Sequence, residues 1–140
     1  MMRRLIVLLC LVLPLAASAQ IGNQWQTMLS SFTTAVAPAT PAAAVVKATP
    51  GAVTSVTCFN ILATPVYIKF FNATSVTLGT TSAVMNMMCP GNTAGAGFVV
   101  PFVNAMYFTV GIEYAVTGGI GLTDNTSITA TSVIVNIGYN

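Results

Sequence analysis

The sequence predicts an all-β protein, an antiparallel β-sandwich or jelly roll of about seven or eight short strands over residues 45–140. Three observations predict this class. Short runs rich in Val, Thr and aromatic residues recur about every ten residues. Gly, Pro, Asn and Thr separate these runs. No stretch with helical periodicity lies between them, so the connections are expected to be turns and loops.

The expected strands follow the chain in order. They cover residues 53–61, 66–72, 83–89, 98–103, 105–116, 127–130 and 133–139. Gly111 indicates that the longest run is either two strands or one strand with a bulge. In the second run, Ile68 and Phe70 are expected to face one way and the residues between and beside them the other, because side chains alternate along a strand.

Residues 1–19 are predicted to be a signal peptide. Arg3 and Arg4 precede an apolar run of about 13 residues that ends in small residues, the pattern of a cleaved export signal. Cleavage is expected between Ala19 and Gln20. The run is shorter than the roughly 20 residues of a membrane-spanning helix, so no stable membrane insertion is expected. The predicted location is extracellular, periplasmic or virion-associated.

Residues 20–44 are predicted to be a helical arm followed by a linker. Apolar residues with helical spacing stand at Ile21, Trp25, Met28, Leu29, Phe32 and Val36. An Ala-, Pro- and Thr-rich stretch follows over residues 38–44. The amphipathic helix could pack on its own domain, dock on a neighbouring subunit as an assembly arm, or lack order. The sequence leaves these alternatives open.

Charge excludes several classes of function. Of 140 residues, four are Lys or Arg, two are Asp or Glu, and none is His. A nucleic-acid binder needs a basic footprint, and acid–base catalysis needs paired titratable groups. We therefore expect no enzyme activity, no cofactor and no nucleic-acid partner. After cleavage the remaining charged side chains balance, and a net charge near zero favours association, so a homo-oligomer is expected.

Cys58 and Cys89 remain after the predicted cleavage. In an oxidising compartment such a pair is often bonded, although two buried free thiols are the alternative. Two Cys without His do not complete a zinc site. A calcium site at Asp124 and Asn125 would hold one carboxylate only, so a β-turn explains these residues better. No metal is therefore expected.

Aromatic residues offer a candidate interaction surface at Tyr67, Lys69 and Phe71. Lys69 is expected to face solvent with its stem covering the two rings, or to guard an edge strand against wrong pairing. Tyr67, Phe71, Tyr107 and Tyr114 could form a patch for glycan or protein, but packing inside a sandwich explains them equally well. A glycan partner is thus an expectation without further support.

Several segments, in order, resemble a known family. They are Lys47-Ala48-Thr49-Pro50-Gly51, Tyr67-Ile68-Lys69-Phe70-Phe71-Asn72, Phe108-Thr109-Val110-Gly111-Ile112, Thr117-Gly118-Gly119, Asp124-Asn125-Thr126 and the closing run 133–139. Over about residues 46–139 the chain resembles small β-sandwich virion proteins of tailed phages, which decorate the head or serve as minor structural components. The resemblance implies a β-sandwich fold and capsid or other assembly subunits as partners.

The leading hypothesis is therefore a non-enzymatic structural protein whose β-sandwich packs on a larger assembly. Two alternatives stay open. One is a secreted or cell-surface binding module, adhesin-like or glycan-binding, which the predicted signal peptide favours. The other is a self-assembling extracellular filament subunit, which the low charge also suits. Sedimentation with particles, with cells or as polymers of the protein alone distinguishes the three.

Overall fold

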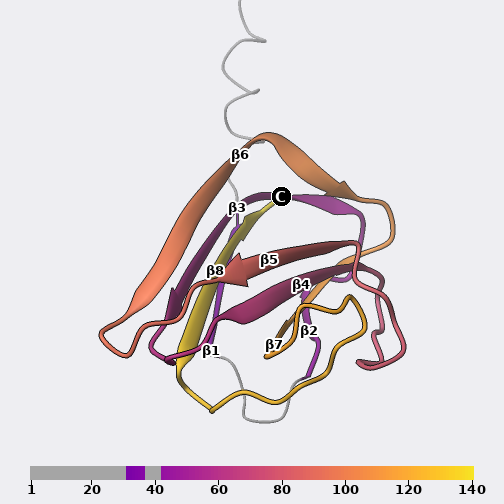
Figure 1. The fold of residues 1–140 in the computed structure, drawn as a ribbon. Coiled ribbons are helices and arrows are strands. Elements are labelled where there is room, and N and C mark those ends of the chain that lie inside the picture. The colour runs from indigo at the N-terminus through magenta and orange to yellow at the C-terminus, as the bar shows by residue number, and fades with distance from the viewer. Residues whose placement is uncertain (1–30, 37–41) are drawn as a thin grey trace, which may run out of the picture.

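Two four-stranded sheets make up the part of the chain that the structure, a computed structural model, describes: residues 31–36 and 42–140 (Figure 1). The strands are β1 (Ser31–Val36), β2 (Ala44–Lys47), β3 (Gly51–Asn60), β4 (Val66–Asn72), β5 (Met85–Cys89), β6 (Ala96–Phe108), β7 (Ile112–Thr117) and β8 (Val133–Tyr139). Sheet A has the order β1-β8-β3-β6 and sheet B the order β2-β7-β4-β5. Every pairing is antiparallel, and the predicted all-β class is confirmed.

The strand pairings are nested along the chain. β1 pairs with β8, β2 with β7, β3 with β6 and β4 with β5. Two further pairings, β3 with β8 and β4 with β7, join these pairs into the two sheets. Among the described strands, β4 and β5 are the consecutive pair that stays in one sheet; every other connection crosses between sheets. Long-range pairing therefore holds the whole domain together.

The main core lies between the two sheets. Buried apolar side chains from β3 and β8 meet those from β4 and β7; the largest include Val53, Val56, Ile68, Phe70, Ile112 and Ile137. Most are β-branched or aromatic, types that suit a pleated and half-buried surface. Ile68 and Phe70 share this core, as their alternation along the strand predicts.

A disulfide between Cys58 on β3 and Cys89 on β5 joins the sheets, with the two Cα atoms 6.1 Å apart. This confirms the pairing expected from the sequence. Both cysteines are buried in the main core. The bond is consistent with an oxidising, extracellular environment.

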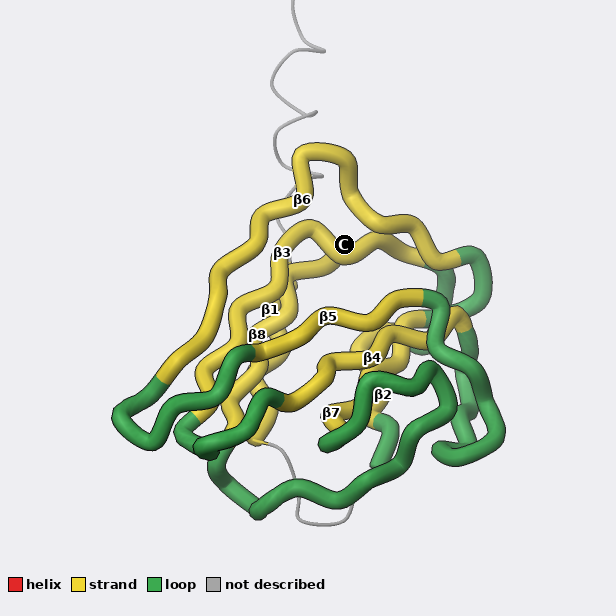
Figure 2. Tube along the Cα trace, in the orientation of Figure 1, coloured by secondary structure: helices red, strands yellow, loops and turns green. Residues whose placement is uncertain are grey.

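A second, smaller core covers the outer face of sheet B. Phe71, Ala83 and Ala115 are buried there, with Val76 and Leu78 packed against them. These residues come from β4, β7 and the loop between β4 and β5, which Figure 2 draws in green beside the sheet. The central strands of sheet B, β4 and β7, are thus covered on both faces, and all six residues of β7 are buried. The alternation of side-chain types along the sequence does not distinguish a strand that is buried on both faces from a strand with one exposed face.

The helix expected over residues 20–37 is wrong where the structure describes it. Residues 31–36 form β1, with Phe32 opposite Gly138 and Val36 opposite Ile134. Without β1, the backbone groups along one side of β8 would lack partners, so tertiary pairing overrides the helical spacing. Four further residues of the expected helix, Ile21, Trp25, Met28 and Leu29, lie outside the described residues, as does the predicted signal peptide with its cleavage site at Ala19 and Gln20.

The run 105–116 divides into two strands, which is one of the two alternatives expected from Gly111. The break lies between β6 and β7, where Gly111 is so close to the Ala73 carbonyl oxygen that a Cβ would come within 2.8 Å of it. Another segment differs from expectation. Residues 127–130 form no strand. Ile128 is buried in the main core instead, and Thr131 adopts a positive φ of 62°. This segment is therefore a loop anchored by one apolar side chain.

Candidate functional site

The charged side chains of the described residues all come from the strands of sheet B or from the loop after β7. Lys47 lies on β2, Lys69 on β4, Glu113 on β7 and Asp124 in the loop after β7. The four strands of sheet A contain no Asp, Glu, Lys or Arg. A surface built by sheet A is thus free of the ions that are costly to desolvate on contact with a partner.

The outer face of sheet A exposes apolar side chains in register. Thr57, Val99 and Asn136 form one row across β6, β3 and β8; Phe59, Gly97 and Ile134 form the next. Their neighbours Cys58 and Val135 point into the main core, which places these rows on the opposite face. Val99 is 71% exposed and Phe59 47%. We call the outward residues of β3, β6 and β8 the uncharged face.

Glycines form a shallow groove at one end of the uncharged face. Thr57, Phe59, Gly95, Gly97 and Val99 line it. Gly95 has a φ of 97°, and a Cβ there would come within 2.6 Å of the Phe59 ring. The ring therefore lies directly against the backbone of this segment. An exposed aromatic ring beside small residues is a good anchor for a partner side chain.

The opposite end of the uncharged face carries a projecting bend in β6. Ser55 pairs with Pro101 and Val53 with Met106, so two steps along β3 oppose five steps along β6. The additional residues bow out, and Figure 1 shows the sharp bend in β6 at the top of the view. We call residues 102–105 the β6 tip. Val103 within it is fully exposed.

The edge of β6 away from β3 is poorly suited to pairing with an added strand, so we consider the outer face of β6 as the docking surface. β6 is the last strand of sheet A and pairs with β3 among the described strands. Pro101 lies in the middle of it and has no N–H to donate to an incoming strand. Proline in an edge strand is one way proteins avoid edge-to-edge pairing.

Lys69 is fully buried, which corrects both expectations for this residue. β4 lies between β7 and β5, so Lys69 is neither solvent-facing nor on an edge strand. Its Nζ donates to the carbonyl oxygens of Gly119, at 3.1 Å, and Asp124, at 3.0 Å. It also lies 3.7 Å from Oδ1 of Asp124. The lysine therefore holds the loop after β7 against the outer face of sheet B.

Asp124 organises the same loop from within. Its Oδ1 accepts hydrogen bonds from the backbone N–H groups of Gly119, at 2.9 Å, and Thr126, at 3.0 Å, and its Oδ2 accepts one from the Thr126 hydroxyl. Burial favours the neutral carboxyl, but these bonds and the Lys69 ammonium outweigh it and hold the pKa of Asp124 below its ordinary value. The turn expected at Asp124 and Asn125 is built around this carboxylate.

Burial lowers the pKa of Lys69, and the nearby Asp124 carboxylate offsets part of that shift. Glu113 is also buried, and its pKa is raised by desolvation despite a backbone hydrogen bond from Val76. Burial raises the pKa of Tyr114 as well. Each of these groups is part of the packing of sheet B or of the core.

The surface expected at Tyr67, Lys69 and Phe71 does not form, because Lys69 and Phe71 are buried and Tyr67 is half-buried. The wider aromatic patch does not form either. Tyr107 is exposed on sheet A, whereas Tyr114 is buried in the core between the sheets. The partners of Lys69 could not be predicted from the sequence, because they lie in a loop fifty or more residues later in the chain.

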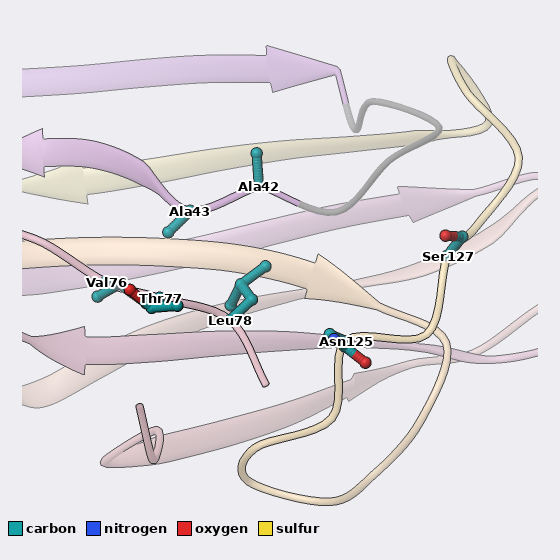
Figure 3. Close-up of a pocket in the computed structure, with 7 residues that line it drawn as sticks. All are labelled: Ala42, Ala43, Val76, Thr77, Leu78, Asn125 and Ser127. Atoms are coloured by element: carbon teal, nitrogen blue, oxygen red, sulfur yellow. The ribbon is translucent and has the colours of Figure 1, made fainter. Parts of the chain in front are cut away.

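A shallow cleft lies beside sheet B, where β2 approaches two loops (Figure 3). Its lining residues are small, apolar or hydroxyl- and amide-bearing: Ala42, Ala43, Val76, Thr77, Leu78, Asn125 and Ser127. None of these side chains is ionisable, so this cleft offers no acid–base pair. In the described part of the chain, no three His, Cys, Asp or Glu residues gather in a way that could hold a metal ion. Within the same residues, no helix has the length and apolar character needed to cross a membrane.

The most distinctive surface of the described residues is therefore the uncharged face, with the Phe59 groove at one end and the β6 tip at the other. It combines exposed apolar side chains with Thr and Asn and carries no charge. Sequence reasoning had placed the candidate surface on β4 instead. Comparisons of the chain with protein-family models, curated proteins and solved structures found no match.

Proposed function

We propose that this protein is a non-enzymatic structural subunit that packs on a larger extracellular or virion-associated assembly through the uncharged face. The observation that carries the proposal is the composition of sheet A, whose four strands contain no charged residue yet leave Val99 and Phe59 open to solvent. Large exposed apolar patches on soluble domains mark interaction sites.

The physical reason is the balance of desolvation and burial. Covering apolar surface contributes about 25 cal/mol per Å² to association. Ions buried at the same time would offset this gain, because their lost hydration is often not recovered. On the uncharged face, the polar groups are Thr, Ser and Asn side chains, which can exchange water for hydrogen bonds with a partner.

The strand order supports a jelly roll as the fold of this subunit. A long hairpin that rolls into two sheets pairs its first strand with its last, its second with the one before the last, and so on toward the middle of the chain. The strands of this chain pair in that way, as β1–β8, β2–β7, β3–β6 and β4–β5. Jelly rolls occur in viral capsid proteins, and also in lectin domains and cupins. The fold is therefore compatible with a role in an assembly but does not distinguish that role from the others.

The disulfide and two expectations from the sequence support the proposed location and partners. Residues 46–139 resemble phage virion decoration proteins, which implies neighbouring assembly subunits as partners. The Cys58–Cys89 disulfide and the predicted signal peptide at residues 1–19 both suit export to an oxidising compartment.

A density gradient tests the proposal. The extracellular fraction of a culture that makes the protein is banded, and the protein is located by mass spectrometry after chymotrypsin digestion, since Lys47 and Lys69 are the trypsin sites beyond the predicted signal peptide. We expect its peptides to band with large particles. Recovery at the top of the gradient or with cell envelopes would contradict the assembly role and favour a soluble or cell-surface binding module.

A further inference from the structure

We propose that the partner on the uncharged face is a second copy of this chain, packed face to face about a two-fold axis. This inference rests on the proposed function and deepens it by naming the first contact of the assembly. Three features of the described residues support a second copy as the occupant: the location of the charges, the size of the face and the arrangement of its two ends.

The charges favour self-association. A partner for the uncharged face must itself present a surface that loses little on desolvation, and the same face on another copy meets this requirement. Two lysines and two acids lie on the sheet B side, so each copy is electrically balanced there. Face-to-face packing leaves the partly exposed Lys47 and Asp124 outside the interface, while Lys69 and Glu113 are already buried within each copy. Copies with little net charge do not repel one another.

The size of the face is close to what a reversible dimer needs. The three strands of the uncharged face lie about 4.8 Å apart and have a mean length of about ten residues at about 3.3 Å each, which gives a face on the order of 480 Å². Two copies would therefore bury roughly 950 Å², close to the ~1,000 Å² expected of a biological interface and in the range of weak, transient ones. An interface of this size predicts a weak dimer, with a dissociation constant in the micromolar range.

The two ends of the face complement each other. The Phe59 groove lies at one end of the face, beside Gly97, and the β6 tip with Val103 lies further along β6, beyond Pro101. A two-fold contact places residue i of one copy against residue j of the other and the reverse. A two-fold axis that crosses the face near Val99 and Pro101 therefore places the β6 tip of each copy near the Phe59 groove of the other.

Two lysine variants test this inference. Val99→Lys places a charge on the outer side of β6 next to the proposed axis, where the lysine of each copy would be buried against the lysine of the other. Ile120→Lys is the matched control, because Ile120 is 70% exposed, almost the same as Val99 at 71%, but lies in the loop beside sheet B. Sedimentation equilibrium on the purified, oxidised proteins from about 1 to 300 μM measures the dissociation constant. Circular dichroism establishes that each variant is folded.

We expect a reversible wild-type dimer in the micromolar range, a Val99→Lys dissociation constant raised at least tenfold, and an Ile120→Lys value within twofold of wild type. Should Val99→Lys fail to fold, Val99→Thr, which keeps the shape and removes apolar area, is expected to weaken the dimer severalfold. A wild-type monomer throughout the range, or equal effects of the two lysines, would overturn the inference. A monomer that nevertheless bands with particles would overturn the second copy as partner while leaving the proposed function standing.

Discussion

Replacing Lys69 with Met removes the cation that holds the loop after β7 while keeping most of the buried stem. The Lys69 ammonium makes two hydrogen bonds, to the carbonyl oxygens of Gly119 and Asp124, and lies 3.7 Å from the Asp124 carboxylate. Lys69→Met therefore leaves two carbonyl groups and one carboxylate without their cation. The change tests whether this buried charge organises the outer side of sheet B.

The magnitude follows from these contacts. Hydrogen bonds to a charged group contribute about 1.5–3 kcal/mol each, and removing one partner of a buried ion pair costs about 3–5 kcal/mol. Asp124 keeps its bonds from Gly119 and Thr126 and is partly exposed, so the lower end applies. We expect a loss of about 3 kcal/mol, which in a domain of this size lowers Tm by roughly 10–20 °C.

Thermal unfolding followed by circular dichroism at pH 7 measures this loss. Lys47→Met is the matched control, because the Lys47 ammonium donates one exposed hydrogen bond, to the Asn140 carbonyl at 2.9 Å. Its loss should cost less than about 1 kcal/mol. Chymotrypsin should also cleave Lys69→Met faster than wild type within residues 118–126. Equal and small changes in Tm for the two variants would refute the structural role given to Lys69.

Two other predictions concern stability. Replacing both Cys58 and Cys89 with Ala should lower the free energy of unfolding by roughly 3–4 kcal/mol, the amount a cross-link across 31 residues contributes through the entropy of the unfolded chain; urea titration measures it, and a loss below about 1 kcal/mol would contradict this account. The pKa of Glu113 in the folded state lies above its ordinary value of 4.5. Well below pH 4.5 the Glu113 carboxyl is protonated in both the folded and the unfolded state. As the pH rises above 4.5, the carboxyl ionises first in the unfolded state, so the free energy of unfolding falls. Glu113→Gln should therefore match wild type at pH 4 and exceed it at pH 7, and a wild type that gains more stability than the variant between these values would contradict the assignment.

The sequence predicted the sandwich because its strands are short, β-branched and separated by turn residues, and those signals are local. It also placed Ile68 and Phe70 on one face of their strand and favoured a bond between Cys58 and Cys89. Such features depend on the spacing of neighbouring residues or on the small number of cysteines, so one sequence is enough to find them.

The features that sequence reasoning missed depend on distant segments. Phe32 lies in a strand because β8, a hundred residues later, needs a partner along its edge. Lys69 is buried because a loop some fifty residues downstream supplies carbonyl groups and Asp124. The uncharged face was not predicted, because it too combines segments that are distant in the sequence. Its rows combine residues of β3, β6 and β8, and the register of the sheet brings together Phe59, Gly97 and Ile134.

The central claim is that sheet A, and not sheet B, is the assembly surface, and hydroxyl-radical footprinting tests it most directly. The protein is oxidised in the assembled state and again after dissociation, and modification is quantified at exposed reporters on each sheet. Phe59 and Tyr107 report on sheet A, and Met88 on β5 reports on sheet B. This account predicts that assembly slows modification of Phe59 and Tyr107 severalfold and leaves Met88 unchanged. Protection of Met88 with no change at Phe59 and Tyr107 would contradict it.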